Sequence, residues 1–190
     1  MQDISLHLLD ILENSIRADA SVVNVCIEIN KRDNRLKIMV TDNGHGMSED
    51  ILMNSQNPFF TTKENRVKKV GLGIPLFKQN AEHCDGSFNI ISAKNKGTEI
   101  VAEFRLDHID RMPLGSIPDT ILTSLLGHPD IEFIVEMIKI SSDGEKSNFI
   151  FDTKDIKQEL DGFPINNPEV TGFIRDYLTE GINNIYKEEI

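Results

Sequence analysis

The segment Thr41-Asp42-Asn43-Gly44-His45-Gly46-Met47 is the first of three short segments that decide the fold of this chain. The other two are Asn57-Pro58-Phe59-Phe60-Thr61-Thr62-Lys63 and Gly71-Leu72-Gly73-Ile74. Glycine allows a backbone to come close to a phosphate and to present its N–H groups to it. An acidic residue in a glycine-rich turn, a loop rich in donors and a second glycine pair together predict a nucleotide pocket closed by a lid.

A helix is expected before these segments, over residues 3–17. Its apolar side chains recur at helical spacing on one side, at Ile4, Leu8, Ile11, Leu12 and Ile16. Asp10, Glu13 and Asn14 gather on the opposite side. The pattern predicts a helix that packs on the core and carries carboxylate and amide oxygens on its polar face.

Strands and helices alternate in the rest of the first half. Strands are expected over 22–30, 36–41, 87–92 and 98–106, a short helix after Ser48, a lid over 57–71 and a helix over 72–84. This order predicts an α/β protein, a two-layer α/β sandwich with helices over one face of a mixed sheet.

These motifs resemble those of the GHKL superfamily of ATP-binding domains, which includes gyrase-type topoisomerases, Hsp90 chaperones, sensor histidine kinases and MutL ATPases. The resemblance covers about residues 3–106. It implies the Bergerat-type ATP-binding fold, ATP as ligand and Mg²⁺ as cofactor. In the box Leu12-Glu13-Asn14-Ser15, it implies that Asn14 coordinates the Mg²⁺ that bridges the phosphates. Mg²⁺ prefers oxygen ligands and keeps several waters.

The same resemblance implies the adenine end of the pocket. Asp42 takes the role of the carboxylate that accepts a hydrogen bond from the exocyclic amine, a donor that guanine lacks at that position. Gly44 and Gly46 let the chain turn under the base. Thr98, in Gly97-Thr98-Glu99, supports the adenine contact through water.

The phosphate end is implied by the other two segments. Thr61, Thr62 and Lys63 would donate hydrogen bonds to phosphate oxygens. Gly71 and Gly73 would present backbone N–H groups at the start of a helix, where the macrodipole also favours anions.

The position of the general base departs from the hydrolytic branch of the superfamily. That branch places a Glu four residues before the Asn, on the same helix face, whereas this chain has Asp10 there. The shorter side chain loses about 1.5 Å of reach. A misplacement of about 1 Å can cost about 10²-fold in rate. Glu13 is a competing candidate, and His7 is expected to be a surface or core histidine rather than a phosphoacceptor.

A boundary is expected near residues 112–118, where two prolines and Gly115 occur. The prediction is a GHKL-type ATP-binding domain at 1–112 and a small acidic α/β domain of unknown role at 113–190. The second part holds 6 Lys and Arg against 15 Asp and Glu, and the first holds 14 against 16. Such an acidic surface argues against nucleic acid as a partner. It indicates a solvated acidic face or, as the less expected alternative, a basic protein partner.

The elements expected in the second part are helices over 120–126, 154–160 and 168–186 and strands over 133–140 and 148–151. The sequence has no apolar run of roughly 20 residues and no secretory leader, so a cytoplasmic protein with no membrane span is expected. Cys26 and Cys84 are expected to be buried thiols.

The predicted function is that of a Mg-ATP-binding regulatory protein, an ATP-gated switch on a protein partner with slow or no hydrolysis. Two alternatives stay open. One is a protein kinase that phosphorylates His or Ser of a separate partner, and the other is a stand-alone ATPase. The sequence assigns no oligomeric state.

Overall fold

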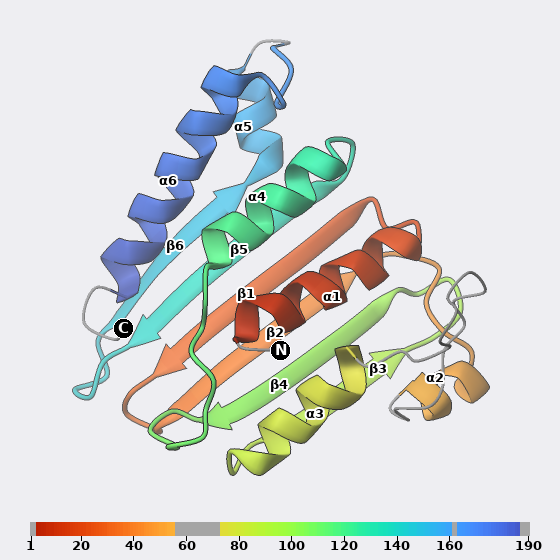
Figure 1. Cartoon of the computed structure of the whole chain (residues 1–190), viewed down its shortest axis with the longest axis vertical. Coiled ribbons are helices and arrows are strands. Elements are labelled where there is room, and N and C mark those ends of the chain that lie inside the picture. The colour runs from red at the N-terminus through yellow and green to blue at the C-terminus, as the bar shows by residue number, and fades with distance from the viewer. Residues whose placement is uncertain (1–2, 56–72, 161–162, 187–190) are drawn as a thin grey trace.

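The computed structural model describes residues 3–55, 73–160 and 163–186. Six strands form a single sheet in the order β3-β4-β2-β1-β5-β6 (Figure 1). The strands are β1 Val22–Asn30, β2 Arg35–Asp42, β3 Ser87–Ser92, β4 Thr98–Arg105, β5 Glu132–Ile140 and β6 Lys146–Asp152. The helices are α1 Ile4–Arg17, α2 Glu49–Ser55, α3 Gly73–His83, α4 Ile117–Gly127, α5 Thr153–Glu159 and α6 Pro168–Tyr186.

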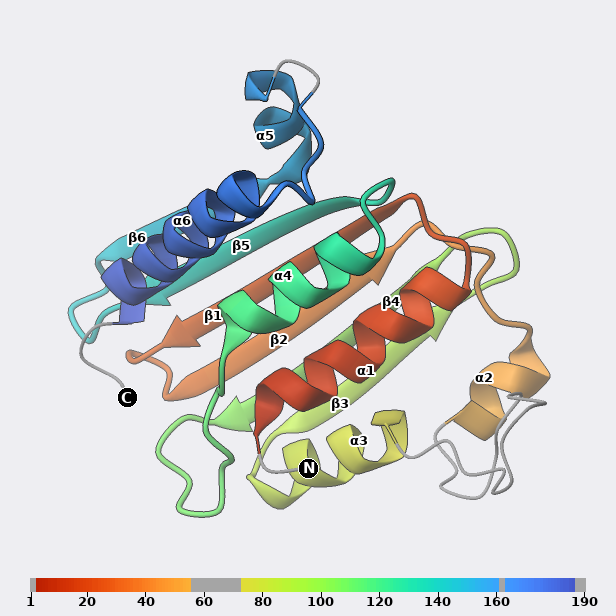
Figure 2. The ribbon, with the colours of Figure 1, turned by 45° about the horizontal axis from the view of Figure 1, so that its top comes forward.

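The sheet is mixed, and one of its faces is covered by helices. β1 pairs with β5 in parallel, while the other four neighbouring pairs are antiparallel. Helices α1, α3, α4 and α6 lie over the same face (Figure 2). Val23, Val25 and Ile27 of β1 point into this layer and are buried, whereas the residues between them are not. The predicted α/β fold, with helices on one face of a mixed sheet, is confirmed.

Helix α1 forms where the sequence predicts it, for two local reasons. Asp3 accepts a hydrogen bond from the backbone N–H of Leu6 and so caps the first turn. Ile4, Leu8, Ile11 and Leu12 are buried, as the helical spacing predicts. Asp10, Glu13 and Asn14, the polar residues predicted on the opposite side, are only partly buried.

The second part of the chain extends the same sheet and the same core. β5 pairs with β1 along nine residues, and α4 packs beside α1. Helix α4 begins three residues earlier than expected, because Ser116 caps it and Pro118 fits its first turn. The division into domains at 1–112 and 113–190 stays a prediction, since a shared sheet does not establish whether either part folds alone.

Two further expectations concern membranes and cysteines. None of the helices within the described ranges combines the length and the apolar character that crossing a bilayer requires. Cys26 and Cys84 are both free thiols. Cys84 is buried as predicted, but Cys26 lies on the open face of the sheet and is partly exposed.

Candidate functional site

A buried carboxylate marks the centre of the candidate site. Asp42 is the last residue of β2, and its side chain is 8% exposed. Its Oδ2 accepts a hydrogen bond of 2.8 Å from the Ser15 hydroxyl of α1, and its Oδ1 accepts one of 2.9 Å from the backbone N–H of Gly44. Burying a charge is costly unless it is paired or hydrogen-bonded. Both oxygens of Asp42 are therefore held in fixed positions by neighbouring elements.

Gly44, Gly46 and Gly97 allow the backbone segments around the Asp42 carboxylate to come into contact. A Cβ on Gly46, which has φ +63°, would lie 2.0 Å from the Ala93 carbonyl oxygen. A Cβ on Gly97, which has φ +80°, would lie 1.9 Å from the Asp42 carbonyl oxygen. A side chain at either position would meet rigid backbone, so the turns that follow β2 and β3 need glycine there.

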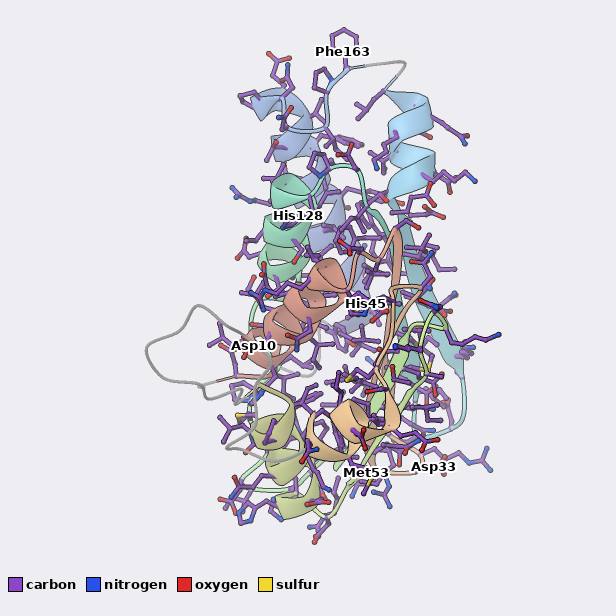
Figure 3. All side chains as sticks on the ribbon, turned by 90° about the vertical axis from the view of Figure 1, so that its right-hand side faces the viewer. Asp10, Asp33, His45, Met53, His128 and Phe163 are labelled. Atoms are coloured by element: carbon purple, nitrogen blue, oxygen red, sulfur yellow. The ribbon has the colours of Figure 1, made fainter. Side chains whose placement is uncertain are left out.

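The end of α1 takes part in the same contact. A Cβ on Gly44 would lie 2.6 Å from the Ala18 carbonyl oxygen, and that oxygen accepts a hydrogen bond of 2.8 Å from the His45 N–H. Figure 3 labels His45 in this turn and Asp10 on α1. The predicted Gly44 thus lies beside Asp42 and against the end of α1, whereas Gly46 lies against the turn that follows β3.

Thr98 lies directly opposite Asp42 in the register between β2 and β4. Its Oγ1 is 2.9 Å from the Ser92 Oγ, and the Ser92 hydroxyl donates to the Gly97 carbonyl oxygen at 2.9 Å. Because a hydroxyl carries one proton, Thr98 is the donor to Ser92. The Thr98 oxygen keeps its lone pairs, which can accept a hydrogen bond from a water molecule.

The polar face of α1 meets the first residue of α3. A Cβ on Gly73 would lie 3.0 Å from the Asp10 Oδ2, so these two predicted residues are in contact. The N-terminus of a helix favours negative charge because of its free N–H groups and its dipole. The Asp10 carboxylate therefore lies at an end of α3 that is suited to anions.

Glu13 and Asn14, the other two predicted residues on the polar face of α1, differ in their hydrogen-bond partners. The Glu13 Oε2 accepts a hydrogen bond of 2.9 Å from the Arg17 guanidinium in an ion pair at the surface. The Asn14 side chain is half-buried, and no hydrogen bond to it occurs within the part of the chain that the structure describes. The Asn14 amide oxygen is thus available to a ligand. Glu13, the competing candidate for the base, is engaged elsewhere.

Thr61, Thr62, Lys63 and Gly71 lie outside the described residues, so their predicted roles at the phosphates stay predictions. The sequence-based prediction also missed three residues that build the site, namely Ser15, Ser92 and Gly97. Ser15 carries a recognisable signal: it continues the buried stripe of Leu8 and Ile11 with a polar side chain. A hydroxyl on an apolar stripe indicates a buried hydrogen-bond partner, which here is Asp42.

His7 belongs to the core that supports this site. Its ring stacks on Phe77 of α3 with 5.0 Å between centroids, and its Nε2 is 3.0 Å from the Asn80 Nδ2. Burial lowers the pKa of His7 from its ordinary value. Of the two predicted alternatives, surface or core, the structure shows a core histidine that joins α1 to α3.

Comparison with known proteins identifies the family to which this chain belongs. A sequence profile described as "Histidine kinase-, DNA gyrase B-, and HSP90-like ATPase" matches residues 2–108. Sporulation kinase D of Bacillus subtilis (strain 168) is 31% identical over 93 residues, which is 49% of this chain and 18% of that protein. Sporulation kinase C of the same organism is 33% identical over 90 residues, which is 47% of this chain and 20% of that protein. The chain thus spans about a fifth of the length of these relatives.

Similar solved structures include the Aquifex aeolicus MutL ATPase domain complexed with ADP. It has a TM-score of 0.44 and 13% identity, and the match covers 85% of this chain and 68% of that one. The family profile covers more than half of the 190 residues. This chain therefore belongs to the histidine kinase-, DNA gyrase B- and HSP90-like ATPase family.

Proposed function

We propose that this protein binds Mg-ATP and acts as an ATP-gated switch on a protein partner, with slow or no hydrolysis. The observation that carries the proposal is the buried Asp42 carboxylate, held by Ser15 and Gly44 at the position that the family resemblance assigns to adenine recognition. Family membership and the contacts of Gly46, Gly97 and Thr98 around this carboxylate support it.

The residues present fit an adenine base. Each oxygen of a carboxylate has two lone pairs, and Ser15 and Gly44 occupy one on each oxygen of Asp42. A free lone pair can accept a hydrogen bond from the exocyclic amine of adenine. A hydrogen bond to a charged group contributes about 1.5–3 kcal/mol. Guanine has a carbonyl oxygen in place of that amine, and two acceptors facing each other would repel.

The residues also fit a magnesium ion bound together with phosphates. Such an ion usually has one or two protein ligands, several waters and phosphate oxygens in its coordination shell. The amide oxygen of Asn14, which accepts no hydrogen bond from the residues that the structure describes, would supply one ligand. Asn14 lies one helical turn after Asp10, on the side of α1 that meets the start of α3.

The fate of the γ-phosphate depends on Asp10. It lies against Gly73, at the end of α3 suited to phosphates, but it is one carbon shorter than the Glu of the hydrolytic branch. We infer a base held too far from the attacking water for fast turnover. The second candidate function is a protein kinase that transfers the γ-phosphate to a His or Ser of a separate partner. It is favoured by the names of two relatives, sporulation kinases C and D.

Calorimetry with ATP and GTP, with and without Mg²⁺, tests the binding proposal. Asp42→Asn should weaken ATP binding at least tenfold, because about 1.5–3 kcal/mol depends on the charged hydrogen bond. Asn14→Ala should weaken binding only when Mg²⁺ is present. Asp155→Asn, a change of an exposed carboxylate on α5, serves as the matched control and should leave both affinities unchanged. Equal affinity of the wild type and Asp42→Asn would refute the adenine assignment.

Steady-state ATPase assays separate the candidate functions. If Asp10 is a base with insufficient reach, Asp10→Glu should raise the rate and Asp10→Asn should abolish it, because an amide cannot take the proton. In a kinase the partner's side chain is the nucleophile, so neither change should alter phosphotransfer by more than severalfold. A wild-type rate within the usual enzymatic range of about 1–10³ s⁻¹ would contradict a switch with slow or no hydrolysis.

A further inference from the structure

The sheet ends in two edge strands, β3 and β6, that differ in charge. Within the described residues no further strand pairs with the outer side of either one. The six residues of β3 include no charged side chain. The seven residues of β6 include two, Lys146 at the beginning and Asp152 at the end. An unpaired strand edge presents free N–H and C=O groups that can pair with another chain.

The side chains of β6 alternate between the two faces of the sheet. Phe151 is buried on the side of the helices, and Phe149 shares that side. Lys146, Ile150 and Asp152 share the open face, and Ile150 is 52% exposed. The two charged residues thus lie on one face, three positions to either side of Phe149.

We propose that the β6 edge is the interface through which a second copy of this chain binds. The two β6 strands pair antiparallel about a two-fold axis at Phe149, so that one sheet continues through both copies. In this register Lys146 of each copy lies opposite Asp152 of the other, on the same face. Opposite charges directly across an antiparallel pair stabilise it. A two-fold axis makes the favourable pair occur twice.

An aromatic cluster on α6 adds apolar surface beside this edge. Phe173 and Tyr177 are 57% and 40% exposed, and their rings stack with 6.1 Å between centroids. Tyr177 also contacts Phe149 of β6, with 5.4 Å between ring centroids. Exposed aromatic side chains that are already ordered favour association, because they bury large area at low entropic cost.

The chemistry of β6 favours a second copy over a basic partner. A basic peptide would suit the acidic second part of the chain, but it would meet Lys146 at the strand edge. The self-complementary pair Lys146–Asp152 suits a strand of identical sequence. The net negative charge of residues 113–190 opposes this association and is screened over about 8 Å at physiological ionic strength. The dimer should therefore be of moderate affinity.

Sedimentation and light scattering on the nucleotide-free protein, at about 100 µM, test the interface well above a micromolar Kd. Ile150→Glu should weaken dimerisation at least tenfold. Ile91→Glu is the matched control, because Ile91 is 58% exposed on β3 at the other edge of the sheet. It should leave the dimer unchanged. A monomeric wild type, or a dimer disrupted by Ile91→Glu and not by Ile150→Glu, would overturn the proposal.

A charge-exchange experiment tests the register. Lys146→Glu places two acidic residues opposite each other, and Asp152→Lys places two basic ones, so each variant alone should be monomeric. A mixture of the two variants should form a heterodimer, because both cross-strand pairs are then of opposite charge. Asp152 also caps α5 by accepting a hydrogen bond from the Lys154 N–H, so circular dichroism must show both variants folded. If Asp152→Lys does not fold, the oligomeric state of Lys146→Glu alone tests the register. A mixture of folded variants that stays monomeric, or a dimeric Lys146→Glu, would refute the register.

Discussion

The hydrogen bond between Ser15 and Asp42 gives the sharpest test of the site without any ligand. Ser15→Ala removes the hydroxyl that donates to the Asp42 Oδ2 at 2.8 Å, in a pair that is almost fully buried. A hydrogen bond to a charged group contributes about 1.5–3 kcal/mol. At about 2–4 °C per kcal/mol for a chain of this size, the melting temperature should fall by about 3–12 °C.

A double-mutant cycle in urea unfolding isolates the pair. In the Asp42→Asn background the Ser15 hydroxyl meets a neutral amide, so Ser15→Ala should cost only about 0.5–1.5 kcal/mol there. Ser124→Ala is the matched control, because Ser124 is also a buried helical serine but donates to the Thr120 carbonyl oxygen. Its cost should be the same in both backgrounds. A Ser15→Ala protein as stable as wild type, or additive effects of the Ser15 and Asp42 changes, would refute the reasoning.

The same variants connect the pair to nucleotide binding. Without Ser15, the Asp42 carboxylate loses the bond that fixes Oδ2 and can rotate away from the base. We expect Ser15→Ala to weaken ATP binding at least severalfold, while Ser124→Ala leaves it unchanged. An unchanged ATP affinity in Ser15→Ala would mean that Gly44 alone orients the carboxylate.

Three further predictions concern stability. Because the pKa of His7 is lowered in the folded protein, His7 binds a proton more readily in the unfolded chain. The free energy of unfolding should therefore decrease as pH falls below about 6.5. His7→Gln should remove this pH dependence. Gly172→Ala should stabilise α6 by about 0.5–1 kcal/mol, because its Cβ would meet nothing within 4 Å, whereas Gly181→Ala should destabilise, because its Cβ would lie 2.2 Å from the Phe149 ring. Tyr186→Phe should raise the free energy of unfolding by about 1 kcal/mol, because the buried hydroxyl has no partner within the described residues. Urea unfolding at several pH values measures all three.

Much of the fold could be predicted because its signals are local. The apolar period of α1 and the alternation in β1 and β2 each depend on a few neighbouring residues. The parallel pairing of β1 with β5 could not be predicted in this way, because the partners are about a hundred residues apart. Nothing in the sequence of β1, Val22–Asn30, identifies β5 as the strand that pairs with its other edge.

Some parts of the candidate site could likewise be predicted from local sequence, and others could not. Asp42, Gly44 and Gly46 follow from one short segment, because a turn of this composition has specific backbone requirements. The hydrogen bond from Ser15 depends on how α1 is rotated over the sheet, and the place of Thr98 opposite Asp42 depends on strand register. Rotation and register are decided by the packing of the whole core, so a local pattern does not contain them.

The start of α1 shows why the second part of the chain matters to the pocket. The first N–H groups of a helix have no partner within it and need acceptors. Ile4 and Ser5 donate theirs to the carbonyl oxygens of Pro113 and Leu114, at 3.0 and 2.9 Å. Gly115 follows with φ +72°, and a Cβ there would lie 2.6 Å from the Ser5 Oγ. Residues beyond the family match therefore anchor the helix that carries Asp10, so a cut at 112/113 separates donors from acceptors at the base of the candidate site.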